Sequence, residues 1–557
     1  MIEMKTNLSK PSLFIILAIL ALSFLRCNLE TGKEYLPKPK TDSTLAVKQG
    51  LVGAWYHGKN LTRIGASMLL KDLNPTWDVI TGRGNSWSAQ WEGYLTAPAT
   101  GSIKFYAECD RELIVAIAGK DILHIGNENS QNMAALNLKK GQQYHINVKY
   151  LQDKGGTTSF NVLWSWENKD SVPIPEEALN FSKEQADWWN YVELPDRSEF
   201  DMSSLNTIPS ENYVAYYEPG RFAGWPANNG VWCWGNEILV GFSLGYHKTD
   251  VSGGHSIRDD MPSRVVLGRS TDGGKTWSLE DPENLFGSEN DKSPDINFAH
   301  PDFSMRITNS RYFVSYNRGK TWEGPYSITI DTQGEEVGEL TNRTDYLVLG
   351  PQKCLVFMSA ETGTVEGDYQ DRAFCVLTTD GGITFKFMGW MTQDTEKRSV
   401  MPSTAQVGKN HLVSVMRRKH EESFGDRPSL VTNWIEAAES TDNGKTWVNI
   451  GKVADTDRGE RNGNPPAMVR LSDERLCVAY GYREYPYGIR MKVSKDNGKT
   501  WGKECVIRAD GATWDLGYCR MVINADGKLV IIYYFTTEEK YEQHIAVSII
   551  DPQLLED

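Results

Sequence analysis

The string STDGGKTW, from Ser270 to Trp277, is polar and turn-prone, yet it ends in a tryptophan. Nearly the same string returns four times, as SYNRGKTW at 315–322, TTDGGITF at 378–385, STDNGKTW at 440–447 and SKDNGKTW at 494–501. Its third position falls at 272, 317, 380, 442 and 496, so the intervals are 45, 63, 62 and 54 residues. Repeats at about 40 to 60 residues in a β-rich sequence are typical of the blades of a β-propeller.

Each residue type in the string has a structural use. Asp and Asn accept hydrogen bonds from the backbone of their own turn, Gly supplies a left-handed position, and the hydroxyls close the loop. The tryptophan can then tuck beneath the hairpin as an anchor. We therefore expect the carboxylates of these strings to hold turns rather than to catalyse.

The repeated string resembles the Asp-box, or BNR repeat, of the sialidase (neuraminidase) superfamily. In that family the boxes lie at hairpins of a six-bladed propeller, far from the catalytic face. The resemblance implies an all-β fold with a sialidase-like propeller over residues 209–557. A first blade without a box, from Tyr213 to about Gly245, brings the number of blades to six, and residues 544–550 are expected to close the ring.

Short segments before the propeller alternate apolar and polar residues, as in Ile103, Phe105 and Ala107. This period of two predicts antiparallel sheets packed as a β-sandwich. The stretch WEGYLTAPATGSIKFYAECDRELIVAIAGKDIL at 91–123 resembles the PA14 family, which implies a PA14-like sandwich over residues 50–178 and a linker at 179–208. Sugar-binding members of that family hold calcium with a paired Asp, and the matching place here reads Cys109-Asp110.

The first 27 residues are interpreted as a lipoprotein signal peptide. Lys5 and Lys10 precede the apolar run Leu13 to Leu25, which is too short to span a bilayer of about 30 Å as a helix. Cys27 follows this run and resembles the lipidated cysteine of a bacterial lipobox, with residues 28–49 as a linker. The expected location is the bacterial cell envelope, with a membrane contact through the N-terminal lipid anchor; secretion with an unmodified Cys27 is the alternative.

The bulk composition limits the choice of partner. The net charge of −14 and the pI near 5.3 argue against a nucleic-acid partner, because phosphate binding requires a basic surface. Seven cysteines besides Cys27 are widely spaced and form no CxxC pair, so neither a disulfide framework nor a zinc site is indicated.

The sialidase resemblance implies a set of site residues for an anionic sugar. Three arginines supply charge and forked donors that lysine cannot match, and the positions that match are Arg221, Arg417 and Arg490. The nucleophile implied by the stretch WDLGYCRMVINADGKLVIIYY is Tyr518. A tyrosine avoids the repulsion that a carboxylate nucleophile would meet from the substrate's own charge.

The family's proton donor is an Asp in the loop before the first box, which here offers Asp259 and Asp260. The family's Glu partner of the nucleophile falls at Met401, so this carboxylate is missing; the alternatives left open are Glu396, Glu436 and Glu460. His247 and His255 lie in the loop of the first blade, and Arg461, Asn462 and Asn464 are candidates for the central pocket.

The predicted function is that of an exo-glycosidase, similar to exo-α-sialidases, which releases a terminal sialic or related acidic sugar from glycans. No metal or other cofactor is required for this chemistry. One alternative is a propeller rhamnosidase or a lyase acting on uronate-containing polysaccharide, and a second is a non-catalytic glycan-binding surface lipoprotein.

Overall fold

The computed structural model describes residues 48–57, 61, 63–77, 87–126, 130–152, 158–191, 200–248, 255–282, 285, 294–365, 368–424, 427–457 and 463–555. The predicted signal peptide, Cys27 and nearly all of the 28–49 segment lie outside these residues, as do Glu460, Arg461 and Asn462. None of the helices within the described ranges is long and apolar enough to cross a membrane.

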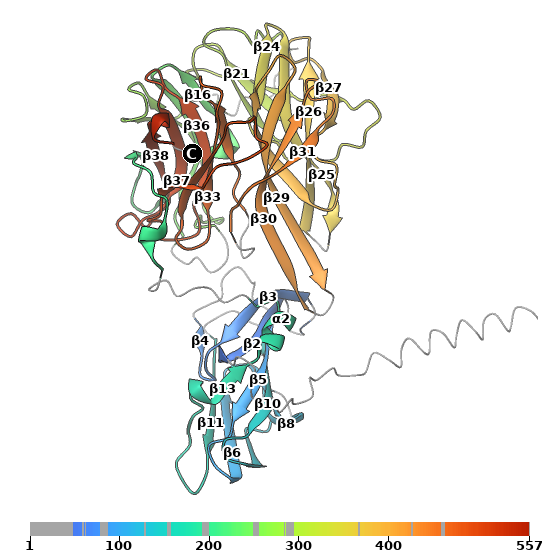
Figure 1. The fold of residues 1–557 in the computed structure, drawn as a ribbon, viewed down its shortest axis with the longest axis vertical. Coiled ribbons are helices and arrows are strands. Elements are labelled where there is room, and N and C mark those ends of the chain that lie inside the picture. Colours follow the sequence, from blue (N-terminus) through green and yellow to red (C-terminus); the bar gives the residue numbers. More distant parts are fainter. Residues whose placement is uncertain are drawn as a thin grey trace, which may run out of the picture.

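The chain forms a β-sandwich followed by a six-bladed β-propeller, and the two parts are stacked along the long axis of the molecule (Figure 1). The sandwich packs an eight-stranded sheet against a five-stranded sheet. The strands of the larger sheet are β1 (Lys48–Gln49), β2 (Leu51–His57), β3 (Arg63–Leu70), β5 (Trp87–Thr96), β7 (Glu112–Ile117), β8 (Lys120–Ile125), β10 (Gln143–Gln152) and β13 (Leu179–Phe181). Those of the smaller sheet are β4 (Thr76–Trp77), β6 (Gly101–Cys109), β9 (Met133–Leu138), β11 (Thr158–Ser165) and β12 (Val172–Pro173).

The sandwich core follows from the alternation in the sequence. In β6 the side chains of Ile103, Phe105 and Ala107 are buried, while Lys104 and Glu108 between and beside them are exposed. Trp91 of the facing sheet and Phe160 of the neighbouring strand β11 belong to the same core. The segment predicted as a linker begins within this unit, because β13 pairs with β5 before the short helix α2 (Lys183–Trp188) leads away.

Six sheets form the propeller, and contacts between their inner strands connect β24 to β28, β28 to β32, β32 to β36 and β36 to β16. The first blade holds β15 (Arg221–Gly224), β16 (Val231–Trp234), β17 (Glu237–Tyr246), β18 (Arg264–Ser270) and β19 (Ser278–Glu280). The second holds β20 (Ser304–Thr308), β21 (Arg311–Ser315) and β22 (Glu323–Ser327). The third holds β23 (Ile330–Asp331), β24 (Tyr346–Gly350), β25 (Lys353–Val365), β26 (Asp368–Thr378) and β27 (Phe385–Trp390).

The remaining three blades have four strands each. The fourth holds β28 (Arg398–Gln406), β29 (Leu412–Phe424), β30 (Arg427–Ser440) and β31 (Val448–Asp455). The fifth holds β32 (Ala467–Arg470), β33 (Leu476–Tyr482), β34 (Gly488–Ser494) and β35 (Cys505–Arg508). The sixth holds β36 (Gly517–Ile523), β37 (Leu529–Phe535), β38 (His544–Ile550) and β14 (Glu211–Tyr216). Short helical turns lie at α3 (Pro226–Asn229), η1 (Glu176–Ala178), η3 (Met202–Ser204) and η4 (Pro552–Leu554).

The ring closes by pairing its first strand with its last. Strand β14 lies antiparallel to β38, with Glu211 opposite Ile549 and Tyr213 opposite Val547, as the prediction for residues 544–550 required. The blade without a box is the sixth and not the predicted first one. The reason is that Tyr213 belongs to β14, so the first blade begins at β15 and carries the box at 270–277.

The boxes have the predicted local chemistry. In the first box the Ser270 hydroxyl donates to Asp272 at 2.8 Å, and the backbone N–H and hydroxyl of Thr276 donate to the same carboxylate at 2.9 and 2.6 Å. The Trp277 indole N–H donates to the Gly274 carbonyl at 2.8 Å, which anchors the ring under the turn. Burial raises the pKa of Asp272, but the hydrogen bonds from Thr276 and Ser270 outweigh it and lower the pKa to about 2.

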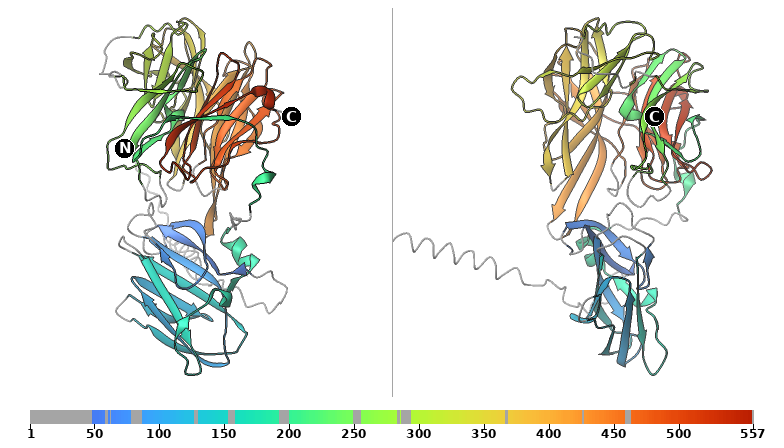
Figure 2. Two further views of the ribbon diagram at one scale, coloured as in Figure 1. Left: turned by 90° about the vertical axis from the view of Figure 1, so that its left-hand side faces the viewer. Right: turned by 180° about the vertical axis from the view of Figure 1, so that it is seen from behind.

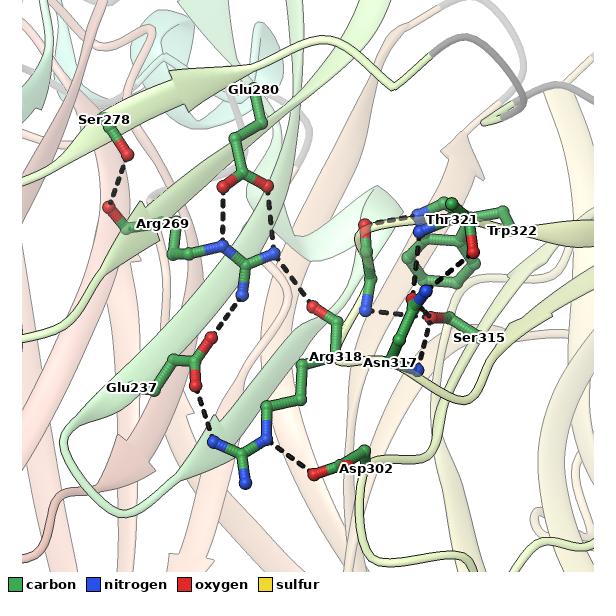
Figure 3. A network of polar contacts seen from close by, with 11 residues as sticks. Glu237, Arg269, Ser278, Glu280, Asp302, Ser315, Asn317, Arg318, Thr321 and Trp322 are labelled. Carbon is green, nitrogen blue, oxygen red and sulfur yellow. Dashed lines mark hydrogen bonds and ion pairs between the residues drawn. The ribbon is translucent and has the colours of Figure 1, made fainter.

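An ion-pair network next to the second box joins the first two blades (Figure 3). Arg269 donates to both oxygens of Glu280, at 2.6 and 2.9 Å, and to Glu237 at 2.7 Å. Arg318 of the second blade donates to the other oxygen of Glu237 at 2.6 Å and to Asp302 at 2.6 Å. Glu237 is therefore shared between two guanidinium groups from adjacent blades.

One hairpin connects the propeller to the sandwich. Strands β29 and β30 extend from the fourth blade to β3, and the Asn190 amide donates to the Pro428 carbonyl (Figures 1 and 2). In the fourth blade the box occupies the turn between the third and fourth strands, β30 and β31, whereas this hairpin joins the second strand to the third. Because neighbouring strands are antiparallel, the two kinds of turn lie at opposite faces, so the sandwich lies on the side away from the boxes.

Candidate active site

Tyr518 stands at the start of β36, the inner strand of the sixth blade, in a constrained backbone conformation. Its φ is 49° and that of Gly517 is 102°, both in the left-handed region. The Asn464 side chain fixes this turn, because its oxygen accepts from the Tyr518 N–H at 2.8 Å and its amide donates to the Leu516 carbonyl at 3.2 Å. A Cβ at position 517 would lie 2.3 Å from the Asn464 oxygen, so only glycine fits there.

Arginines from different blades surround the Tyr518 ring. Arg417, on β29 and buried, donates to the Tyr518 hydroxyl at 3.2 Å and to the Gly463 carbonyl at 3.3 Å. Arg483, just beyond the end of β33, places its Cζ atom 5.5 Å from the centroid of the Tyr518 ring and donates to the Tyr534 hydroxyl at 2.7 Å.

This surrounding charge changes the acidity of the phenol. Burial raises the pKa of Tyr518, but the positive charges of Arg417, Arg483 and Arg343 outweigh burial and lower the pKa below its ordinary value. The phenolate is therefore more accessible here than on an ordinary tyrosine. A nucleophile or general base requires this property.

Further cations reach the same region from the third and fourth blades. Arg343 precedes β24 and donates to Asn228 at 2.8 Å. Arg398, at the start of β28, donates to Asp371 at 2.6 Å, and Asp371 also accepts from Thr341. Within the ranges that the structure describes, neither Arg343 nor Arg417 forms an ion pair with a carboxylate. Two cations at the site are thus available to an anionic ligand.

Met401 occupies the place of the missing Glu and lies in one small apolar cluster with Ala227, Val400 and Tyr518. Of the alternatives, Glu436 accepts hydrogen bonds from Arg418 and Trp434, and Glu396 is exposed. Among the described residues, arginines rather than a neighbouring carboxylate therefore set the acidity of Tyr518.

The structure brings Arg417 and Tyr518 together but gives Arg221 and Arg490 other partners. Arg221 stacks its guanidinium on the Tyr246 ring at 4.2 Å. Arg490 donates to the carbonyls of Arg508 and Pro486 at 2.7 and 2.8 Å, within the fifth blade. Neither contacts Tyr518 in the part of the chain that is described, and their roles in substrate binding stay predictions.

Asp259 and Asp260 lie in an exposed turn before β18. Both oxygens of Asp260 accept from Arg258, at 3.0 and 2.6 Å, and this hydrogen bonding lowers the pKa of Asp260. Their role as proton donor also stays a prediction.

Sequence reasoning gave no role to Arg343, Arg398, Arg483 or Asp515, although Asn464 was a candidate for the pocket. Arg483 stands seven residues before the predicted Arg490, in the same hairpin of the fifth blade. The signal that separates them is position: Arg483 follows the end of a strand, where side chains reach the face of a propeller, whereas Arg490 lies within a strand.

No group of three or more His, Cys, Asp or Glu side chains that could hold a metal ion occurs among the residues with a described position. Asp110 of the sandwich, at the place of the calcium-binding pair, accepts from the Tyr150 hydroxyl at 3.1 Å and from the Ser159 N–H at 3.2 Å. Its carboxylate is thus part of the sandwich's own hydrogen bonding.

Comparisons with known proteins agree with the two-part architecture. Residues 298–531 match a BNR repeat-like domain, residues 269–279 match a BNR/Asp-box repeat, and residues 81–178 match a PA14 domain. No curated protein matches the sequence.

The chain also matches solved structures at low sequence identity. A protein of unknown function from Dyadobacter fermentans is 24% identical, with 61% of this chain and 97% of that chain covered and a TM-score of 0.44. The α-L-arabinanase of Penicillium chrysogenum, solved with arabinobiose, is 14% identical, with 62% and 99% covered and a TM-score of 0.38. The A domain of epithelial adhesin 6 from Candida glabrata, in complex with Galβ1-3GlcNAc, is 12% identical, with 26% and 92% covered and a TM-score of 0.21. At these scores we infer nothing about activity from them, and the family matches alone establish that the chain combines a PA14 domain with a propeller of BNR repeats.

Proposed function

We propose that the propeller is a glycoside hydrolase that releases a terminal acidic sugar, sialic acid or a related sugar acid, from a glycan, with Tyr518 as nucleophile. The observation that carries this proposal is the contact between the Tyr518 hydroxyl and Arg417 at 3.2 Å, within a group of arginines that lowers the pKa of the phenol.

The arrangement suits an anionic substrate in two ways. Arg343 and Arg417 have no carboxylate partner among the described residues, so a sugar carboxylate can take that place through forked hydrogen bonds. A neutral phenol, or a phenolate whose charge the surrounding arginines balance, approaches such a sugar with less repulsion than an uncompensated carboxylate, and tyrosine is the known nucleophile of sialidases. The proposal requires no metal or organic cofactor.

The presence of Met401 beside Tyr518 bears on which substrates the proposal includes. With a thioether in place of a carboxylate, no carboxylate among the described residues takes the phenolic proton, and the arginines hold the phenolate instead. The proposal therefore extends to acidic sugars other than sialic acid, and the partner glycan is defined by its terminal carboxylate.

The test is hydrolysis of aryl α-sialosides and aryl uronosides by the full chain over roughly pH 4 to 8, next to the variant Tyr518→Phe. We expect turnover by the wild type and a loss of at least about 10²-fold in the variant, because the nucleophile is gone. A fluorinated glycosyl fluoride that traps the intermediate should add its sugar mass to the peptide containing Tyr518. Full activity of Tyr518→Phe would contradict the assignment of the nucleophile.

A uronate lyase is the second candidate, favoured by a phenol of lowered pKa beside two arginines that have no carboxylate partner among the described residues. The same group could remove the proton next to a uronate carboxylate that Arg343 and Arg417 neutralise. An unsaturated product, seen by its ultraviolet absorbance on uronate-containing polysaccharide, would identify this reaction. Binding of acidic glycans without turnover would instead indicate a glycan-binding protein.

A further inference from the structure

His255 lies in the segment between β17 and β18, next to a buried aspartate of the sixth blade. Its Nδ1 atom is 2.6 Å from an oxygen of Asp515, whose side chain is 1% exposed, whereas that of His255 is 31% exposed. The segment is the one in which the predicted proton donors Asp259 and Asp260 stand, but these two carboxylates point to solvent.

Asp515 is an ionised acceptor. Burial raises the pKa of Asp515, but the hydrogen bond and charge of His255 and the charge of Arg483 outweigh burial and lower it. The Tyr534 hydroxyl and the Ser256 N–H also donate to this carboxylate, at 2.6 and 2.7 Å.

Since an ionised carboxylate only accepts, the proton on His255 that faces Asp515 sits on Nδ1. The other ring nitrogen, Nε2, is then left for contact with a ligand. It has no hydrogen-bond partner within the described part of the chain.

The pair shares its scaffold with Tyr518. Arg483 donates to the Tyr534 hydroxyl, which donates to Asp515, and the Tyr518 and Tyr534 rings lie 5.9 Å apart between centroids. Contacts through Asp515 and Tyr534 therefore connect His255 to Tyr518.

Two indole rings flank His255. The ring centroids of Trp225 and Trp514 lie 5.1 and 5.8 Å from that of the imidazole. Arg483 also lies 5.2 Å from the Trp514 ring, which connects this aromatic wall to the cationic site. Aromatic faces beside a partly exposed imidazole suit the apolar face of a sugar ring.

We propose that His255 is the proton donor to the leaving group, oriented by Asp515, and this assignment rests on the proposed hydrolysis. The Tyr518 phenolate oxygen forms a bond to the anomeric carbon while the bond from that carbon to the leaving oxygen breaks, and the leaving oxygen takes the Nε2 proton of the His255 imidazolium, which becomes neutral. Water then attacks the anomeric carbon and gives one proton to Nε2 of His255, while the bond to Tyr518 breaks and restores the phenolate. Asp515 is a positioning residue, because it acts through the imidazole.

The experiment compares the full-length wild type with His255→Ala on two substrates that share the acidic sugar, one with a nitrophenol leaving group and one with a sugar alcohol. A nitrophenolate leaves without a proton, whereas an alkoxide does not. We expect His255→Ala to lose about 10²- to 10⁴-fold on the sugar-alcohol substrate and far less on the nitrophenyl one. Asp515→Asn should show the same dependence on leaving group with a smaller loss.

His411→Ala is the matched control, because His411 pairs with Glu439 at 2.9 Å at a similar exposure but outside the site. It should match the wild type on both substrates, and circular dichroism should show all variants folded. Equal losses of His255→Ala on both substrates, or a selective loss in Asp259→Asn or Asp260→Asn, would overturn the inference while the proposed function stands. If the wild type turns over no acidic glycoside, the proposed function and the role of His255 fall together.

Discussion

The acidity of one side chain determines what the centre of the propeller can do. Tyr518 has a buried position that favours the neutral phenol, and three arginines that favour the phenolate. The balance depends most on Arg417, which is the only one of the three that donates a hydrogen bond to the phenolic oxygen within the described residues.

Removing this charge should raise the pKa of Tyr518. Arg417→Met keeps the length and bulk of the side chain but not its charge. In an ultraviolet titration, the difference in absorbance between the wild type and Tyr518→Phe should show one tyrosine that ionises below the ordinary pKa of 10.0. When both proteins also carry Arg417→Met, the pKa seen in this difference should be higher. Activity that depends on the phenolate should shift to higher pH in parallel. An unchanged titration would show that Arg417 does not control the phenol.

The glycine before the tyrosine offers a second test at this scale. Gly517→Ala combines a positive φ with a Cβ 2.3 Å from the Asn464 oxygen, whereas Gly220→Ala has a positive φ and no atom within 4 Å. We expect the control to lose about 1 kcal/mol of unfolding free energy from strain alone, and Gly517→Ala to lose more and to displace Tyr518. Thermal unfolding and activity of the two variants separate strain from the clash.

At the scale of the element, the sequence predicts the structure of a box but not the full set of residues in the site. The chemistry of a box is complete within eight residues, so its string predicts its structure, and from five strings the propeller follows. The site instead gathers Arg343, Arg417, Arg483 and Tyr518 from four blades. The choice between Arg483 and Arg490 depends on where β33 ends, and a sequence does not fix strand ends to within a few residues.

The boxes should make the fold sensitive to acid. The pKa of Asp442 is lowered, because hydrogen bonds from Thr446 and Ser440 outweigh burial. A lowered folded-state pKa gives stability that is present above the unfolded pKa of about 3.9 and is lost as the pH falls through the folded value. Asp442→Ala should therefore lose about 1 to 3 kcal/mol at neutral pH without loss of activity, and the difference from wild type should shrink in acid.

The second box provides the matched control. Asn317 accepts from the Thr321 N–H at 2.9 Å and donates to the Thr321 hydroxyl at 2.8 Å, so an uncharged amide can hold the same turn. Asp442→Asn should cost less than Asp442→Ala and be less sensitive to acid. Urea unfolding of the three proteins at neutral pH and near pH 3 measures both effects; equal costs for Asn and Ala would contradict this account.

In the whole molecule, the sandwich lies at the face of the propeller that carries the candidate site. Arg417 lies on β29, and the same strand runs on into the hairpin that reaches β3 of the sandwich. Residues Asp259 and Asp260, His255 and Arg483 also lie at loops or strand ends away from the boxes. The sequence does not predict this placement of the sandwich, because the apolar and polar pattern of neither domain specifies the length or direction of the β29–β30 hairpin.

Closure of the ring should decide whether the propeller folds at all. A chain that stops at residue 543 lacks β38, so β14 loses its partner and β37 is left with an open edge. We expect limited proteolysis of this chain to leave a resistant fragment of the sandwich and no resistant propeller. The full-length chain with Val547→Ala, which keeps the strand, should resist proteolysis in both parts. A protected propeller in the truncated chain would show that the last strand is dispensable.

The pairing of Glu211 with Ile549 also determines how late during synthesis the ring of blades can close. These residues are 338 positions apart, from 549 minus 211, so at roughly 5 to 20 residues per second a ribosome takes on the order of 17 to 68 s to supply the partner of β14. The sandwich is complete before this interval begins and can fold while the blades are being made. Throughout it, β14 has no strand partner, and the closed ring around Tyr518 can form only after β38 has been made.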